Sequence, residues 1–183
     1  MKKLKLILPG IFLFVLLSVA VGTTEEVKKT SASTTEASEG IKWYDLDKAL
    51  PLAKEQNKHI FIDFSTAWCG YCKKMDKEVF TKKEVIDLLN NDYIAVKVNG
   101  DGTKELEIDG YKVTEKDLTK KEFQVTGYPT FWWLTADGKK LFKESGYRPA
   151  DFWIQALTWV KDYEYDSTLS KDGTPITEET TKN

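Results

Sequence analysis

The chain has few of the side chains that most often bind metals. Among its 183 residues are two cysteines and one histidine. A structural zinc site needs about four such ligands, so we expect no metal centre, and nothing in the sequence calls for another cofactor. Basic residues are not in excess either: 27 Lys and Arg stand against 29 Asp and Glu and are interspersed with them. A nucleic-acid partner is therefore not expected, because such a partner requires a concentrated basic face.

The two cysteines stand close together, at Cys69 and Cys72. A structural disulfide stabilises a protein mainly by closing a long loop of the unfolded chain, and a bridge this short restrains little. A local staple without function is the alternative. The spacing favours a redox-active pair that cycles between dithiol and disulfide.

The first 22 residues are typical of an export signal. A basic start, MKKLK, precedes an apolar run from Leu6 to Gly22. The run is also about as long as the shortest membrane-spanning helices, so residues 1–22 are expected to be a signal peptide, cleaved after Ala20, or a membrane anchor. Either one predicts an exported protein in the periplasm or another extracytoplasmic compartment, where disulfides can persist.

Composition divides the rest of the chain into three segments. Residues 23–40 are mostly Ser, Thr, Glu, Lys and Ala without an aromatic side chain, which predicts a disordered linker. Residues 41–163 carry the apolar patterns of one folded domain. Residues 164–183 turn polar again and are expected to be a flexible tail.

Strands and helices are expected to alternate within residues 41–163. Residues 60–64 and 93–98 have the apolar runs of buried strands, and residues 130–134 and 140–143 are typical of a hairpin. This order predicts an α/β domain with a mixed central sheet and helices on both faces.

Capping residues mark the expected helices. Asp45 is the expected cap of a first helix, although Pro51 leaves its start open. A second helix is expected over residues 69–79. The remaining helical signals are a capping box at Thr81 and Glu84, a short turn at Thr119 and Glu122, and a last helix after Pro149 with Trp153, Ala156, Leu157 and Val160 facing inward.

The cysteines fall where a strand passes into a helix. A thiolate is the nucleophile in disulfide exchange, and a helix N-terminus stabilises it. We therefore expect an exposed Cys69 to attack a substrate disulfide. Cys72, one helical turn further and shielded, would then resolve the mixed disulfide.

Four segments, FIDFSTAWCGYCKKM, AVKVNGD, VTGYPTFWWL and KESGYRPADFWIQAL, resemble successive landmarks of the thioredoxin superfamily over roughly residues 41–163. The resemblance implies the thioredoxin fold. It also implies that Asp63 is a buried general base for Cys72 with a raised pKa, and that Lys97 lies near it. For Asp63, the alternative is an acid at the end of the strand that faces solvent. For Lys97, a surface lysine is an equal alternative.

The same resemblance implies a substrate-binding loop at Gly127, Tyr128 and Pro129. Pro129 would be the cis-proline of the family, and the main chain of Tyr128 would pair with an extended substrate. Trp68 would be an exposed contact surface beside Cys69, and a packing role is the alternative.

The sequence departs from thioredoxins at several places. Tyr128 is bulkier than the usual aliphatic residue, and Gly70 with Tyr71 replaces Gly-Pro. An inserted stretch, roughly residues 101–117, is typical of exported relatives, including electron-delivering domains of periplasmic reductase systems.

The insertion is rich in acidic residues, which raises the question of calcium. Counted from Asn99, an EF-hand loop would need Gly at its sixth position and Glu at its twelfth, where this chain has Lys104 and Gly110. A solvated acidic loop is expected instead.

These expectations combine into an extracytoplasmic thiol–disulfide oxidoreductase that reduces client proteins through Cys69 and Cys72. Its partners would be client proteins with cysteines or disulfides and a membrane electron-transfer partner. The alternatives are a disulfide isomerase or oxidase, and a binding module that uses the fold without catalysis.

Overall fold

The computed structural model describes residues 40–166 and 168–169. A five-stranded sheet lies at its centre, in the order β1-β3-β2-β6-β7. β3 pairs in parallel with both β1 and β2, whereas β6 pairs antiparallel with β2 and β7. The strands are β1 (Trp43–Tyr44), β2 (His59–Ser65), β3 (Tyr93–Asn99), β6 (Thr130–Leu134) and β7 (Lys140–Ser145). The predicted mixed sheet of an α/β domain is confirmed, and β1 is an addition to it.

The central strand β2 is buried along its whole length. Its run of apolar residues suits a strand covered on both faces, and Asp63 is the one acid within it. The register places Asp63 opposite Lys97 of β3 on one side and Phe131 of β6 on the other. The sheet therefore brings an acid and a lysine that are 34 positions apart into neighbouring strands.

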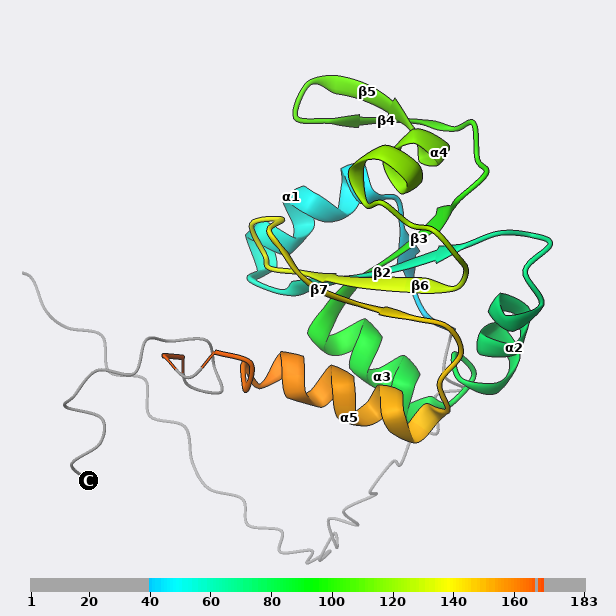
Figure 1. Cartoon of the computed structure of the whole chain (residues 1–183). Coiled ribbons are helices and arrows are strands. Elements are labelled where there is room, and N and C mark those ends of the chain that lie inside the picture. The colour runs from blue at the N-terminus through cyan, green and yellow to red at the C-terminus, as the bar shows by residue number, and fades with distance from the viewer. Residues whose placement is uncertain (1–39, 167, 170–183) are drawn as a thin grey trace, which may run out of the picture. The chain divides into compact units, whose positions relative to one another are not determined.

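Helices cover both faces of the sheet, as predicted (Figure 1). On one face, α1 (Leu46–Gln56) buries Leu46, Ala49 and Ala53 against β2 and β3. On the other face lie α2 (Gly70–Glu78), α3 (Lys83–Asp92) and α5 (Ala150–Lys161), which pack around an aromatic cluster with Trp133 and Trp153. Trp153, Leu157 and Val160 are fully buried as expected, and Ala156 is half-buried.

Two capping predictions prove wrong. Lys82, not Thr81, is the N-cap of α3, and the Thr81 hydroxyl donates to the carbonyl of Lys77 in the preceding helix. Thr119 lies within a helical segment, where its hydroxyl donates to the Glu115 carbonyl. In both cases a carbonyl of the preceding turn competes successfully for the hydroxyl.

The first helix also differs in detail. Asp45 occupies the N-cap position of α1, but its side chain makes no capping hydrogen bond. Its carboxylate instead lies 2.6 Å from Lys104 Nζ. Pro51 lies inside α1, and the helix continues past it.

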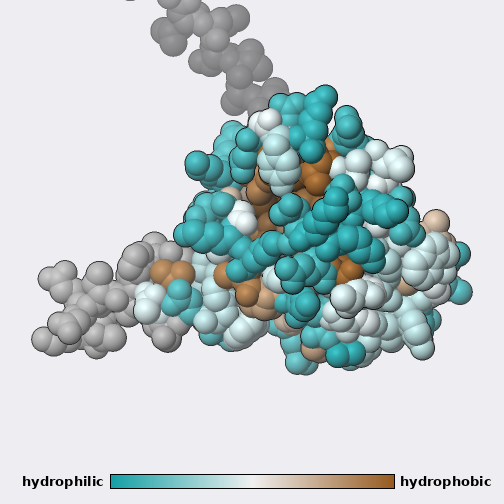
Figure 2. All heavy atoms as spheres, turned by 45° about the horizontal axis from the view of Figure 1, so that its top comes forward, coloured by the Kyte–Doolittle hydropathy of each residue, from teal (hydrophilic) through white to brown (hydrophobic). Residues whose placement is uncertain are grey.

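The inserted stretch is a hairpin and not the solvated acidic loop that we expected. It comprises β4 (Glu105–Ile108) and β5 (Tyr111–Thr114), followed by α4 (Glu115–Asp117) and a π-helical turn over Leu118–Glu122. Leu106, Ile108 and Val113 point inward and join the apolar cluster beneath α1. Figure 2 shows the molecule turned so that the top of Figure 1 comes forward. Hydrophilic residues cover most of the side seen there, with hydrophobic residues between them.

Contacts of the domain continue beyond Tyr163, where we expected it to end. The Tyr165 hydroxyl lies 2.7 Å from Nε2 of His59, which is buried at the start of β2. Within the part of the chain that the structure describes, no helix is both long and apolar enough to cross a membrane. The predicted signal or anchor at residues 1–22, the linker at 23–40 except Gly40, and most of the tail lie outside the described residues.

Candidate active site

The cysteine pair lies at the start of α2, shortly after the end of β2. Cys69 is the N-cap of α2, and its Sγ accepts a hydrogen bond from the main-chain N–H of Cys72 at 3.0 Å. The two cysteines form a disulfide. Cys69 is 5% exposed and Cys72 4%. We expected Cys69 to be exposed and Cys72 to be shielded, but the two cysteines are equally buried. The difference between them is instead the helix N-terminus, which favours a thiolate at Cys69.

Asp63 is a buried acid on the strand that leads to Cys69. Its side chain is 3% exposed, its Oδ2 lies 3.4 Å from Lys97 Nζ, and its Oδ1 has no hydrogen-bond partner. Burial raises the pKa of Asp63 to about 6, against the opposing attraction of Lys97. Asp63 can therefore change its protonation state near neutral pH.

Lys97 connects this buried acid to a more exposed one. Its ammonium group lies 2.5 Å from Asp76 Oδ1 as well as 3.4 Å from Asp63 Oδ2. The neighbouring carboxylates raise the pKa of Lys97 against the effect of burial, so its charge persists at neutral pH. Asp76 was missed in the sequence, although it stands four residues after Cys72 and hence on the same face of α2.

A cleft of about 510 Å³ opens beside the second cysteine. Cys72, Asp76 and Lys97 line it together, so the second cysteine and the lysine that contacts Asp63 border the same cleft. Asp63 itself does not line the cleft and is connected to it through Lys97. The other lining residues are Ser65, Thr66, Ala67, Lys73, Asn99 and Glu115.

Glu115 is a further residue that sequence reasoning missed. It is only 9% exposed, and its Oε1 accepts a hydrogen bond from the main-chain N–H of Asn99 at 3.1 Å. The carboxylate thus joins the end of β3 to the start of α4, directly after the inserted hairpin. No local pattern predicts this, because the two segments meet only in the folded chain.

An exposed tryptophan stands beside the disulfide. Trp68 is 69% exposed, and its indole N–H donates to Asp101 Oδ2 at 2.6 Å. The edge of its ring meets the ring of Tyr128, with 5.7 Å between centroids. Tyr71, between the cysteines, is 64% exposed. These rings give the site an apolar rim that is open to a partner.

The loop before β6 faces this rim. The Tyr128–Pro129 peptide bond is cis. The carbonyl of Gly127 accepts a hydrogen bond from the Thr130 hydroxyl at 2.8 Å, which fixes the loop against β6. Tyr128 is half-buried, and its hydroxyl has no hydrogen-bond partner. The structure therefore brings Trp68, Tyr128 and the cysteines into one region.

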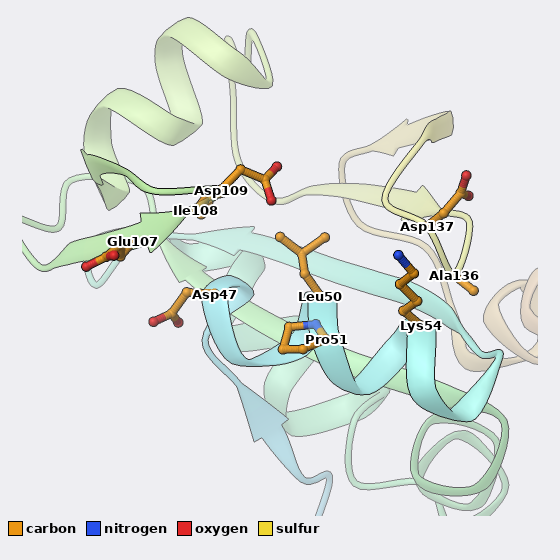
Figure 3. A pocket seen from close by; sticks show the side chains of 9 residues that line it. All are labelled: Asp47, Leu50, Pro51, Lys54, Glu107, Ile108, Asp109, Ala136 and Asp137. Carbon is orange, nitrogen blue, oxygen red and sulfur yellow. The ribbon is translucent and has the colours of Figure 1, made fainter.

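A second pocket, shown in Figure 3, lies away from the cysteines, between α1, the end of β4 and the turn after β6. None of the predicted site residues lines it. Within the described residues, no cluster of three or more His, Cys, Asp or Glu side chains is arranged to hold a metal ion. The lining residues are Asp47, Leu50, Pro51, Lys54, Glu107, Ile108, Asp109, Ala136 and Asp137.

The family follows from comparison with known proteins. The model of the thioredoxin-like domain matches residues 46–161. The chain therefore belongs to the thioredoxin-like family, and with its Cys69–Cys72 pair it is a thiol–disulfide oxidoreductase.

Individual relatives agree with this class. The chain is 29% identical over 113 residues to a protein disulfide-isomerase of Hordeum vulgare, covering 62% of this chain and 19% of that protein. It is 28% identical over 100 residues to the thiol:disulfide interchange protein DsbD 2 of Pseudomonas aeruginosa, covering 52% of this chain and 15% of that protein. The chain thus spans less than a fifth of the length of these curated relatives.

Solved structures support the fold. A thioredoxin-fold protein of Helicobacter pylori superimposes with a TM-score of 0.58 at 22% identity, over 64% of this chain and 78% of that chain.

Proposed function

We propose that this protein is an extracytoplasmic reductase of disulfides in client proteins. One observation carries the proposal: the Cys69–Cys72 pair stands at the N-terminus of α2, beside a cleft that leads through Lys97 to the buried Asp63. The pair supplies two electrons and the acid handles a proton.

The reaction begins with the reduced pair. The Cys69 thiolate attacks one sulfur of the client disulfide, and the other client sulfur leaves as a thiolate that takes a proton from solvent. Cys72 then loses its proton towards Asp63 and attacks Cys69 Sγ, which releases the second client thiol. Two electrons have passed to the client, and Cys69 and Cys72 are joined in the disulfide state described above.

Trp68 and the loop at Gly127, Tyr128 and Pro129 would receive the client. An extended client segment can pair with the main chain of Tyr128 in the manner of an added strand. The exposed Trp68 ring would cover the apolar side chains that flank the client disulfide.

The direction of transfer is supported by the residues between the cysteines. Strong oxidants of this class owe their potential to an unusually stabilised reduced thiolate, and neither Gly70 nor Tyr71 carries a charge that could stabilise one. His59 lies at the opposite end of β2, engaged with Tyr165. A reductase must be recharged by another dithiol, and we assign that role to a membrane electron-transfer partner. The relative named DsbD 2 supports this assignment.

The extracytoplasmic location rests on the sequence of residues 1–22, as a signal peptide or anchor. The enzymatic alternative is a disulfide isomerase or oxidase, supported by the relative named protein disulfide-isomerase. A non-catalytic binding module is the alternative of a different class, and a redox-competent cysteine pair argues against it.

Trapping of clients tests the proposal. In Cys72→Ser, attack by Cys69 survives but resolution does not, so the variant should accumulate mixed disulfides with exported client proteins. These would be detected by non-reducing electrophoresis and dispersed by dithiothreitol. Cys69→Ser is the matched control and should trap none. Trapping by Cys69→Ser alone would reverse the assigned roles, and trapping by neither variant would contradict the proposed function.

A further inference from the structure

The segment that follows β3 contacts both aromatic walls of the proposed client site. Asp101 accepts the hydrogen bond of Trp68, and Gly100 lies against the ring of Tyr128. A Cβ atom at position 100 would stand 2.0 Å from Tyr128 Oη, 2.4 Å from Cζ and 2.5 Å from Cε1. Non-bonded carbon atoms need about 3.5 Å or more, so the position tolerates no side chain while the ring stays in place.

The backbone does not itself require glycine at this position. Gly110, Gly138 and Gly146 have positive φ angles, and Gly100 does not. Any L-residue could therefore adopt its conformation. Space for the Tyr128 ring is what the position demands.

The main chain around Gly100 cannot easily move away. Its N–H donates to the Ser65 carbonyl at 2.8 Å, which ties the segment to the end of β2. Gly102 N–H donates to the Asn99 carbonyl at 2.8 Å, and Asn99 N–H is held by the buried carboxylate of Glu115. A larger residue at position 100 would consequently move Tyr128 and not the segment.

Tyr128 can respond only with its side chain. Its loop is anchored by Thr130 on Gly127 and by the N–H of Gly146 on the Pro129 carbonyl. The Trp68 ring contacts the Tyr128 ring, and Lys120 Nζ lies 4.9 Å from the centroid of the Tyr128 ring. Displaced from Gly100, the ring would swing out of its half-buried site towards the surface that a client must approach.

We propose that Gly100 is a positioning residue for client binding. It leaves the space in which the Tyr128 ring lies, and thereby keeps the main chain of Tyr128 open to an extended segment that carries the client disulfide. This inference rests on the proposed reductase function and concerns the recognition of polypeptide disulfides. A small disulfide without a peptide main chain would not depend on Gly100.

The test compares two disulfides in the full chain, with dithiothreitol as the electron donor. Insulin provides a polypeptide disulfide, and hydroxyethyl disulfide provides a small one. In each turnover the reduced pair delivers two electrons, the probe leaves as two thiols, and dithiothreitol reduces Cys69–Cys72 again. Gly100→Ala should lower kcat/KM for insulin by about tenfold, mainly through KM, and leave hydroxyethyl disulfide within about twofold of wild type.

Two further variants give the test its controls. Gly40→Ala, where nothing lies within 4 Å of the added Cβ, should leave both rates unchanged. Tyr128→Val removes the ring, so adding Gly100→Ala to it should cause no further loss for insulin. The double variant should also fold if Gly100→Ala alone does not.

Several results would overturn the inference while leaving the reductase function intact. These are a normal insulin KM in Gly100→Ala, an equal loss on both disulfides, or an additive loss in the double variant. Failure of the double variant to fold would also overturn it, because Gly100 would then serve something other than Tyr128. A wild-type chain that reduces neither disulfide contradicts the proposed function and this role of Gly100 with it.

Discussion

Asp63 is the residue whose charge is least compatible with its surroundings. It is 2% exposed, one carboxylate oxygen has no partner, and its pKa is raised to about 6. Because the pKa in the folded protein exceeds the usual value of 3.8, folding favours the protonated form. The associated stability is complete below about pH 3.8 and is lost as the pH rises through 6.

Replacement of Asp63 by Asn should therefore stabilise the protein at neutral pH while slowing it as an enzyme. We expect the free energy of unfolding to rise by up to about 3 kcal/mol at pH 7 to 8, and the gain to vanish near pH 4. Urea unfolding across this range measures the gain, and insulin reduction measures turnover. A variant that is less stable at pH 7, or equally active, would remove the proton-handling role.

Sequence patterns reveal such residues only where the chemistry is local. Cys69 and Cys72 lie within one motif, and the apolar run around Asp63 predicts its burial; the role of Asp63 was implied by the family resemblance. For Asp76, the spacing from Cys72 is a local signal, but its contact with Lys97 is not. Glu115 could not be predicted, because its partner, the main-chain N–H of Asn99, lies on another element. Gly100 is a similar case, since its sequence neighbours do not reveal that Tyr128 packs on it.

At the scale of elements, apolar runs were the more reliable signal: Asp45 and Pro149 stand at the starts of α1 and α5 as predicted, but the capping patterns at Thr81 and Thr119 were wrong. The runs at residues 60–64, 93–98 and 130–134 match strands β2, β3 and β6. The hairpin β4–β5 was missed because both strands are short and most of their residues are polar or charged. Only Leu106, Ile108 and Val113 face inward, which is too few to form a clear alternating pattern. β1, with two residues, is too short to leave a pattern.

The segment after α5 is held against the domain by its contacts with one buried side chain, His59. His59 packs against the rings of Tyr163 and Tyr165, and also faces Tyr93. Burial lowers the pKa of His59 to about 4, so the ring is neutral at physiological pH. The stability that this neutral state contributes is present above pH 6.5 and is lost as the pH falls towards 4.

His59→Gln should consequently remove part of the sensitivity to acid. Between pH 6.5 and 4 the wild type should lose stability relative to the variant by an amount on the order of 2 kcal/mol, because the unfolded chain takes up a proton that the buried ring does not. Chemical unfolding at matched pH values measures the difference, in which other titrating groups cancel. Parallel curves for the two proteins would contradict this account, because they would show that His59 has the same pKa in the folded and the unfolded protein.

At the scale of the whole molecule, these two buried groups oppose each other. Acidification from about pH 6 to 4 relieves the cost of a charged Asp63 and creates the cost of a charged His59. The first group belongs to the redox site at one end of β2, and the second anchors the C-terminal segment at the other end. The two effects partly cancel in the wild type. Its free energy of unfolding therefore changes less between about pH 6 and 4 than the effect of either group alone would predict.

The same molecule must also have a redox potential that suits its task. The sheet, the helix N-terminus at Cys69 and the buried acid are compatible with either direction of transfer. The uncharged Gly70 and Tyr71 between the cysteines favour the reducing one. The potential of the pair decides between them, since about 30 mV in a two-electron couple corresponds to about 1.4 kcal/mol of relative stability.

Equilibration of the full chain with a glutathione redox buffer measures this potential most directly, with the fraction of reduced Cys69–Cys72 determined by thiol alkylation. The account predicts a value near about −270 mV, at the reducing end of the range for this class of protein. A value near about −120 mV would contradict it, because the reduced pair would then be too stable to pass its electrons to client disulfides.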